Sequence, residues 1–380
     1  MHIPLVPSFD RLETTTLTVV SPLEEIQALN LPAIFALLPV AKIDLSVPLP
    51  KGKFRYPKEW NMPGQIISMR YGPLTRGYKR KRKKDKEAFP TAITLDIGTH
   101  YRPVNIKFSQ TMKITGAPNF LAVKEAIEGL LNLIKDVQNV CLKEKETPNT
   151  NTGLKWLYDS FDPEEHGQLK NFLDQFDGVL YQGELQAKKY QLEMINMAFD
   201  LGLMVNRKHL AEIVNQEPFN CWYNNVVPSR KLLIYHYYPK VTKKSKISPG
   251  KQTIKVVDTG HALFSGPNPD QMRLIYNTFM LRLLQNYDYV TSSVQNIREI
   301  NVHKGTKMSN DEWLALRKEE LQYTLDLTSG KLPMYEKEFT SEKYVVWADK
   351  LPVFGYRSMS WEDNFNDTES ESDSESESED

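Results

Sequence analysis

The sequence predicts an α+β protein built from two copies of one unit, and three observations predict it. The stretches "MKITGAPNFLAVKEAIEGLLNLI" and "ALFSGPNPDQMRLIYNTFMLRLL" align when Gly116 is laid on Gly266, 150 residues further along the chain. Each contains a short apolar strand, a turn of small residues around the glycine and a long helix. The predicted elements before each stretch follow one order, and both copies contain a basic loop.

Each copy opens with a strand candidate, "TTLTVVS" in the first and "EMINMAFD" in the second. A short helical stretch follows, "SPLEEIQALNLPAIFALL" or "LMVNRKHLAEIVNQE". An aromatic-rich connection, "FRYPKEWNMPG" or "FNCWYNNVVPS", then leads into a second strand candidate, "QIISMRY" or "LLIYHYY". The basic loops come next, at Arg76–Lys86 and Pro239–Lys251.

Two short strand-like runs separated by a tight break precede each glycine, as expected for hairpins. They are "VNIKFS" and "MKIT" in the first copy, and "TIKVVD" and "HALF" in the second. The long helices are amphipathic, so each is expected to lie across one face of its strands, and the other face must meet something else. The alternative is that two unrelated units coincide, because strand–turn–helix is common. The matched order of six elements favours duplication.

Composition is that of a globular protein, with 40% hydrophobic and 25% charged residues in 380. Cys141 and Cys221 give neither a disulfide framework nor metal-ligand spacing. No apolar run reaches the roughly 20 residues of a membrane helix, and the N-terminus lacks the pattern of a signal peptide. We expect an intracellular soluble protein.

The overall balance of 48 basic and 48 acidic residues hides a strong asymmetry. Residues 362–380 hold ten acidic side chains and no basic one, so residues 1–361 have a net charge of +10. A basic body with an acidic tail indicates a polyanionic partner, or a tail that imitates one.

On these strands, turns and helices, the chain resembles a divergent TATA-box-binding protein of the kind encoded by large DNA viruses. The resemblance covers roughly Leu12 to Tyr289. It implies two pseudo-symmetric repeats that form a saddle-shaped antiparallel sheet, with helices on the convex face and DNA on the concave face. The implied segments are a first repeat (1–146), a helical connector (147–190), a second repeat (191–290), a C-terminal extension (291–361) and a disordered acidic tail (362–380).

The family kinks DNA with two phenylalanines from each half, and the resemblance implies Phe108 as one of these wedges. The other three positions fall near Gly64, Arg230 and Val257, none of which is aromatic. Trp60, Trp222 and Tyr223 are possible replacements, or they pack at the sheet ends. The family's central asparagines map near Thr15 or Thr16 and near Met194, and neither is Asn.

The basic loops are the second set of candidate DNA contacts, because lysine and arginine neutralise phosphates and release counterions. The alternatives for the first loop are a nuclear localisation signal or a solvated charge run. The predicted contact residues are Lys79, Arg80, Lys81, Arg82, Lys83, Lys84, Lys243, Lys244 and Lys246.

No enzymatic motif is present, since the sequence lacks GxGxxG, GxxxxGK[ST], HExxH and GxSxG. We expect no enzyme, no metal and no cofactor. In the C-terminal extension, Ser309 and Glu312 form a capping-box pattern at the start of a helix. The aromatic stretch that follows either packs on the fold or docks a partner. The tail is expected either to compete with DNA or simply to solubilise the protein.

The predicted function is a transcription initiation factor that binds promoter DNA through the concave sheet face and recruits transcription machinery. Its expected partners are double-stranded DNA and general transcription factors or RNA polymerase, without a membrane. The expected location is the nucleus or a cytoplasmic viral factory, with packaging in the virion as a further option. The alternative is a protein-interaction or virion scaffold that has kept the fold and lost DNA kinking.

Overall fold

The fold is taken from a computed structural model of the 380-residue chain. The structure describes residues 5–41, 62–78, 91–146, 176–223, 231–241, 247–291, 309–336 and 343–352. The predicted basic residues 79–84, 243, 244 and 246 lie outside these ranges, as do most of the predicted connector and the whole acidic tail.

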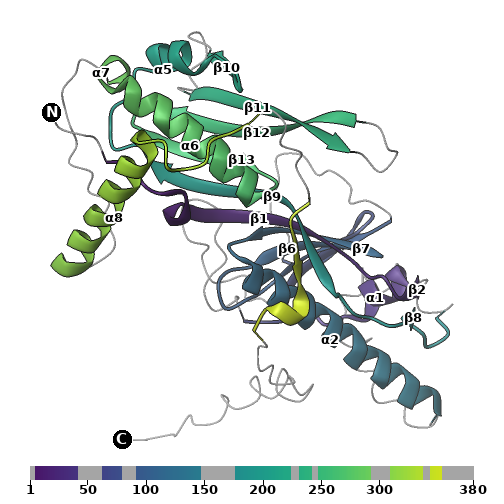
Figure 1. The fold of residues 1–380 in the computed structure, drawn as a ribbon. Helices are drawn as coiled ribbons and strands as arrows, with labels where there is room; N and C mark the ends of the chain where they lie inside the picture. The colour runs from purple at the N-terminus through teal and green to yellow at the C-terminus, as the bar shows by residue number, and fades with distance from the viewer. Residues whose placement is uncertain are drawn as a thin grey trace, which may run out of the picture.

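The molecule is a mixed α+β structure organised around one twelve-stranded antiparallel sheet (Figure 1). The order is β10-β11-β12-β13-β9-β1-β7-β6-β5-β3-β4, with β14 paired to β9, and β2 and β8 form a separate two-stranded sheet. The strands are β1 (Glu13–Pro22), β2 (Ile26–Leu29), β3 (Ile66–Tyr71), β4 (Leu74–Gly77), β5 (Ile93–Ile97), β6 (Val104–Phe108), β7 (Thr111–Ala117), β8 (Tyr181–Gly183), β9 (Lys189–Asp200), β10 (Phe219–Tyr223), β11 (Lys231–Val241), β12 (Ile247–Val257), β13 (His261–Gly266) and β14 (Val345–Trp347).

Two long helices belong to the sheet, and shorter ones connect its strands. We call β1 and β3–β7 with α1 and α2 the first half, and β9–β13 with α5 and α6 the second half. The helices are α1 (Leu31–Leu37), α2 (Phe120–Glu146), α5 (Arg207–Val214), α6 (Pro269–Gln285), α7 (Tyr287–Val290) and α8 (Asn310–Thr328), with 3-10 turns at Phe9–Arg11 and Ala348–Lys350.

The predicted strands and both long helices are observed, with three differences. Only the last part of the first helical stretch is helix α1, because Ile26–Leu29 instead pairs with β8 as strand β2. The connection that begins "FNCWY" starts with an edge strand, β10. Strands β4 and β5 were not predicted. The capping box is confirmed, since Glu312 N donates to Ser309 Oγ and Ser309 N donates to Glu312 Oε2.

One face of the sheet, which we call the helix face, is the core of the protein. Strand alternation puts every second residue on it, and these residues are apolar and buried in neighbouring strands. One cross-strand row of the first half contains Met69, Leu95, Ile106, Ile114, Val19 and Leu192. A matching row of the second half contains Met197, Phe264, Ile254 and Ile234.

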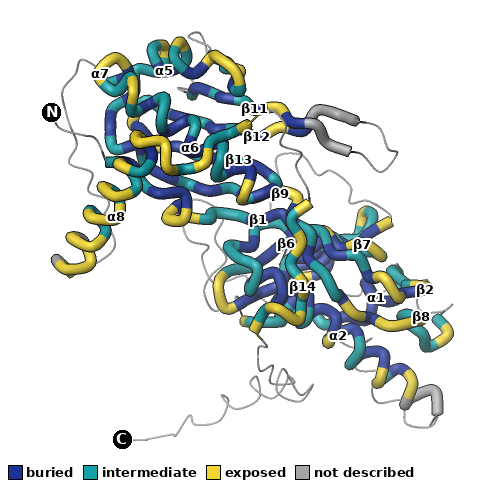
Figure 2. The backbone as a smooth tube through the Cα atoms, viewed as in Figure 1, coloured by how far each residue is buried: buried dark blue, intermediate teal, exposed yellow. Residues whose placement is uncertain are grey.

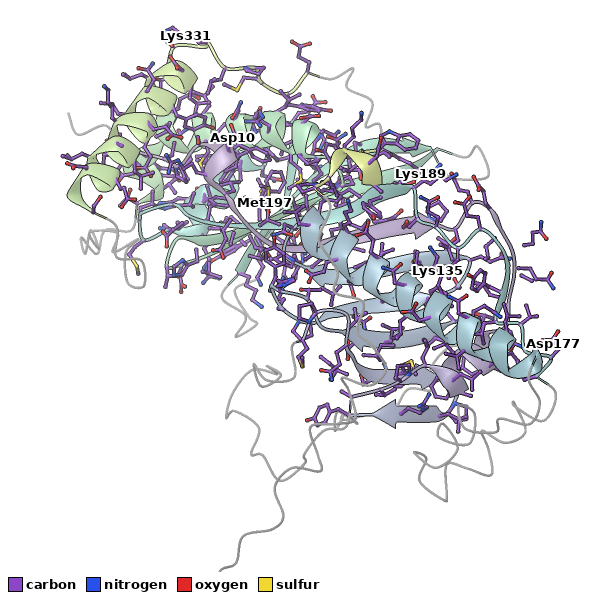
Figure 3. The ribbon with its side chains drawn as sticks, turned by 90° about the horizontal axis from the view of Figure 1, so that it is seen from below. Asp10, Lys135, Asp177, Lys189, Met197 and Lys331 are labelled. Carbon is purple, nitrogen blue, oxygen red and sulfur yellow. The ribbon has the colours of Figure 1, made fainter. Side chains whose placement is uncertain are left out.

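The long helices cover the helix face. Helix α2 lies across the strands of the first half, as Figure 3 shows from below, and its buried side includes Val123, Ile127 and Leu130. Helix α6 covers the second half, where Tyr276 meets Phe199 edge-on and the Phe279 and Phe219 rings are 6.4 Å apart. The side chains on the opposite face of the strands therefore point away from the core.

An asparagine begins each long helix. Asn119 Oδ1 accepts from Ala122 N at 2.8 Å at the start of α2, and Asn268 Oδ1 accepts from Asp270 N and Gln271 N at the start of α6. Such side-chain acceptors satisfy backbone donors that have no partner within the helix. Both asparagines follow the glycine of the aligned turns, so the two turns end in the same way.

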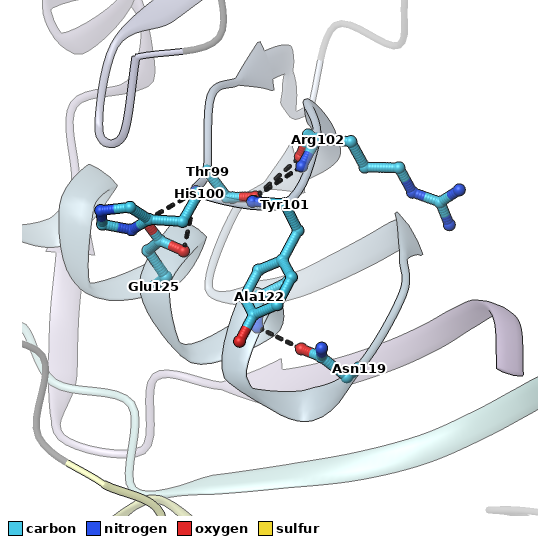
Figure 4. Close-up of polar contacts among 7 residues, drawn as sticks. All are labelled: Thr99, His100, Tyr101, Arg102, Asn119, Ala122 and Glu125. Carbon is cyan, nitrogen blue, oxygen red and sulfur yellow. Dashed lines mark hydrogen bonds and ion pairs between the residues drawn. The ribbon is translucent and has the colours of Figure 1, made fainter. Parts of the chain in front are cut away.

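The β5–β6 loop is fastened to α2 by a buried carboxylate (Figure 4). Glu125, whose side chain is fully buried, accepts from the backbone N of His100 at 3.0 Å and lies 2.5 Å from the His100 ring. Arg102 leaves the same loop in the other direction and donates to the carbonyls of Gly116 and Thr15. These contacts tie the loop to α2 and to the central strands.

The described parts of the C-terminal extension pack on the helices. Helix α8 lies beside α6, where Tyr323 Oη donates to Asn277 Oδ1 at 2.8 Å, and its outer turns are exposed (Figure 2). In the segment 343–352, β14 pairs with the start of β9, and Tyr344 packs on Phe120 of the first half. Lys124 of α2, 4% exposed, donates to the carbonyls of Ala348, Leu351 and Pro352 at 2.9–3.2 Å.

Candidate nucleic-acid interface

The candidate site is the face of the sheet opposite the helices, which we call the open face. Its centre is polar. Asn196 of β9 donates from Nδ2 to Thr16 Oγ1 of β1 at 2.6 Å, and Ser265 Oγ of β13 donates to Asn196 Oδ1 at 2.6 Å. Thr18 and Thr115 are cross-strand partners in the same region. The hydroxyl and amide side chains of this central region can each donate and accept hydrogen bonds.

In the first half, the open face carries polar and mostly cationic side chains. One cross-strand row contains Arg70, Thr94, Lys107 and Lys113. The neighbouring row contains Asp96, which accepts from Ser68 Oγ at 3.1 Å and from Asn105 Nδ2 at 2.8 Å. Both oxygens of the Asp96 carboxylate therefore accept a hydrogen bond from a neighbouring side chain of the sheet.

In the second half, the open face carries aromatic rings beside lysines. Tyr235 and Tyr237 have ring centroids 6.2 Å apart, and Lys251 Nζ lies 4.9 Å from the Tyr235 ring centroid. Trp222 of β10 is 45% exposed and faces Leu233 across the strand pair. The next position in this row is Lys255. We call Trp222, Tyr235, Tyr237, Lys251 and Lys255 the aromatic–lysine patch.

The second half is also free of acidic residues over four strands. Strands β10, β11, β12 and β13 contain no Asp or Glu along their whole length. Burial and the neighbouring Lys231 ammonium lower the pKa of Lys255. Two lysines placed beside each other without a carboxylate in their strands form a site that attracts an anion.

The structure contradicts one predicted contact residue. Phe108 is fully buried and shares the helix face with Val104 and Ile106 of its own strand. A wedge must reach solvent to enter a base step, so Phe108 is a core residue. The prediction failed because it placed the residue by its position at the strand end, whereas strand alternation decides the face.

The two basic loops leave the sheet from distant strands. Residues 79–84 follow β4, which lies at one end of the strand order, and residues 243–246 join β11 to β12 near the other end. Nine strand steps at about 4.8 Å separate β4 from β11, so the loops begin up to about 40 Å apart. A duplex advances about 3.4 Å per base pair, so a separation of this size corresponds to about one helical turn of a duplex.

Sequence reasoning missed Asn196 and the aromatic–lysine patch. The resemblance maps one of the family's central asparagines near Met194, two residues before Asn196. The pairing of β1 with β9 shifts between Thr18 and Val19, which leaves Glu193 as an extra residue in β9. The patch was detectable, because the alternation in "KLLIYHYY" puts Tyr235 and Tyr237 opposite the apolar side of β11.

The His, Cys, Asp and Glu side chains of the described residues do not gather into a metal-binding cluster. Among them, no group of three His, Cys, Asp or Glu side chains is placed to hold a metal ion. His261 and Asp200 form a cross-strand ion pair at 2.6 Å on the surface. In the described part of the chain, no helix has both the length and the apolar character needed to cross a membrane.

No known protein-family model matches the chain, and no curated protein sequence matches it. Among solved structures, the chain is similar to Methanococcus jannaschii TBP, at 12% identity over 71% of this chain and 96% of that one. The TM-score is 0.32, which is too low to carry any argument about residues or activity.

Proposed function

We propose that the chain is a non-enzymatic factor of the TATA-box-binding-protein type that binds double-stranded DNA through the open face. In this proposal the first and second halves are copies of one unit, and their shared sheet forms a saddle over the duplex. The observation that carries the proposal is the open face itself. It carries lysines in both halves and hydrogen-bonded hydroxyl and amide side chains at its centre, while the opposite face consists of buried apolar rows.

The proposed binding mode is dominated by phosphate contacts. Lys107 and Lys113 in the first half and Lys251 and Lys255 in the second half lie on the open face, and the predicted basic loops extend the same charge. Phe108 is buried and supplies no wedge. We therefore expect a smaller bend than the roughly 80° reached by wedge-inserting minor-groove proteins.

The helix face is the proposed surface for general transcription factors or RNA polymerase. The described parts of the C-terminal extension lie on this face, not on the open face. Helix α8 also exposes Leu314, Leu321 and Leu325 together with acidic residues. This division leaves the open face for DNA. The proposed location is the nucleus or a cytoplasmic viral factory, where such a factor would meet its DNA.

The test is a binding titration of the full chain with AT-rich and GC-rich duplexes at several salt concentrations. Replacing Lys113, Lys251 and Lys255 by Ala should lower the slope of log K against log salt by about 1 for each lysine that contacts a phosphate. Lys318→Ala, an exposed lysine on α8, is the matched control. An unchanged slope in the triple variant would remove the open face from the interface.

The burial of Phe108 favours a second candidate, a protein-interaction or virion scaffold that does not kink DNA. The same titration separates the two. A scaffold would show no duplex binding above that of a neutral protein even at low salt, where electrostatic attraction is strongest.

A further inference from the structure

We propose that the aromatic–lysine patch binds unpaired nucleotides, with bases stacked on Tyr235, Tyr237 and Trp222 and phosphates held by Lys251 and Lys255. This inference deepens the proposed function and rests on it, because it assigns melted or single-stranded DNA to one half of the open face. Closed duplex contacts the first half and the lysines of the second half, and the aromatic rings engage only bases that are unpaired.

The spacing of the rings favours unpaired bases. The Tyr235 and Tyr237 centroids are 6.2 Å apart and their planes differ by 36°. Stacked bases in a duplex strand are separated by about 3.4 Å, so the two rings do not fit between successive stacked bases. Bases of a single strand can be splayed apart, and each ring then offers one stacking surface.

The exposure and setting of the rings favour stacking over packing. Tyr237 is 48% exposed and Trp222 is 45% exposed, and each points away from the core from a regular strand. Strand β10, which carries Trp222, pairs with β11, and β11, which carries Tyr237, pairs with β12. The backbone under both rings is therefore held in the sheet. A rigid platform loses little conformational entropy on binding.

The charges around the rings favour a nucleic acid over an apolar protein segment. Lys251 lies over the Tyr235 ring, and Lys255 occupies the row that contains Trp222 and Leu233. Strands β10–β13 contain no acidic residue that would neutralise these ammonium groups. Aromatic faces interleaved with cations are the arrangement that binds single strands without sequence preference.

The experiment is a fluorescence anisotropy titration of the full chain with a labelled oligothymidylate of about 12 nucleotides and with a hairpin duplex of the same length. We expect Trp222→Leu, Tyr235→Leu and Tyr237→Leu each to weaken single-strand binding by roughly 5- to 100-fold. The same variants should leave duplex affinity within about twofold. Tyr235→Phe and Tyr237→Phe keep the rings and should bind the single strand like the natural chain.

Tyr101→Leu is the matched control, because Tyr101 is 44% exposed on the β5–β6 loop of the first half. Duplex binding without single-strand binding would overturn this inference and leave the proposed function standing. Equal weakening of both probes would also overturn it, since the rings would then belong to the duplex interface. Binding of neither probe would overturn both proposals and favour a protein ligand for the patch.

Discussion

The two halves of the sheet have the same strand order outward from β1 and β9, yet they differ in three places. On the open face, strands β3–β7 of the first half are polar with one carboxylate, Asp96, whereas strands β10–β13 of the second half are aromatic and cationic and contain no acidic residue. On the helix face, one cross-strand pair is apolar in the first half and polar in the second. In the turns, Gly116 and Gly266 serve different physical needs.

The comparison shows which positions the fold constrains. Apolar residues recur on the helix face because a helix must bury its apolar side against each half. The open face has no such requirement, so its residues can diverge with the ligand. Differences on the open face therefore report on binding, and differences on the helix face report on stability.

The largest effect should come from removing a core ring in either half. Phe108→Ala and Phe264→Ala each delete a fully buried phenyl group and should lower the free energy of unfolding by about 3–5 kcal/mol. Urea denaturation of the two variants measures this. The affinity of the folded Phe108→Ala protein for DNA should not change. A Phe108→Ala protein of natural stability with weakened DNA binding would restore this residue as a wedge.

The second prediction concerns the polar pair on the helix face. We match the two halves at Gly116 and Gly266 and then follow the strand pairing outward from these glycines. In this match, the cross-strand partners His236 and Gln252 take the places of Ile97 and Val104. Both polar side chains are buried, and among the described residues neither has a hydrogen-bond partner. Burial lowers the pKa of His236 to about 4.

The sign of the resulting pH dependence is fixed. Between about pH 4 and the ordinary histidine pKa near 6.5, the unfolded chain binds a proton at this residue and the folded chain does not. Stability should therefore fall as the pH drops through this window, by up to about 1.4 kcal/mol per pH unit. His236→Ile with Gln252→Val should remove this contribution and leave stability at pH 7 equal or higher. Equal pH slopes before and after the double change would exclude the mechanism.

The third prediction concerns how the C-terminal extension is held on the two halves. On the first half, the buried Lys124 ammonium donates to three backbone carbonyls. On the second half, the bonds are neutral, from Asn277 Nδ2 to Pro333 O at 2.9 Å and from Tyr335 N to Thr278 Oγ1 at 3.1 Å. Hydrogen bonds to charged groups contribute about 1.5–3 kcal/mol, about twice the value for neutral ones.

Lys124→Met should therefore release residues 343–352 for proteolysis more readily than Thr278→Val releases residues 331–336. Limited proteolysis followed by mass spectrometry locates the cuts. Lys135→Met, on the same helix (Figure 3), is the control and should leave the pattern unchanged. If residues 343–352 and 331–336 are both cut in Lys124→Met as slowly as in the natural chain, the lysine does not hold the extension.

Most of the fold was predictable from the sequence, because apolar alternation and helical periodicity follow from the core. The turns were predictable too, since Asn119 and Asn268 are typical helix N-caps. The site was harder. The alternation of Val104, Ile106 and Phe108 assigns Phe108 to the core, whereas the family resemblance implies a wedge at this position. The bulge at Glu193 changes the phase of apolar alternation in β9, from Tyr190 and Leu192 to Ile195, Met197 and Phe199. The exposed Met194 hides this change in the sequence, because it continues the first apolar run by one position.

The smallest effect should come from the two aligned glycines, and it separates two physical reasons for one residue type. Gly116 has φ +87°, and a Cβ there would meet open space. Gly116→Ala should therefore cost about 1–2 kcal/mol through backbone strain alone. At Gly266 the backbone is ordinary, but a Cβ would lie 2.8 Å from Cγ and Sδ of Met272. Gly266→Ala should cost a similar amount through overpacking.

A second change, Met272→Ala, should make the effect of Gly266→Ala much smaller and leave the effect of Gly116→Ala unchanged, because only contacting residues couple. Thermal denaturation of the natural chain, the three single variants and the two double variants gives both coupling energies. Equal coupling energies of Met272 with both glycines would contradict the assignment of backbone strain to Gly116 and overpacking to Gly266.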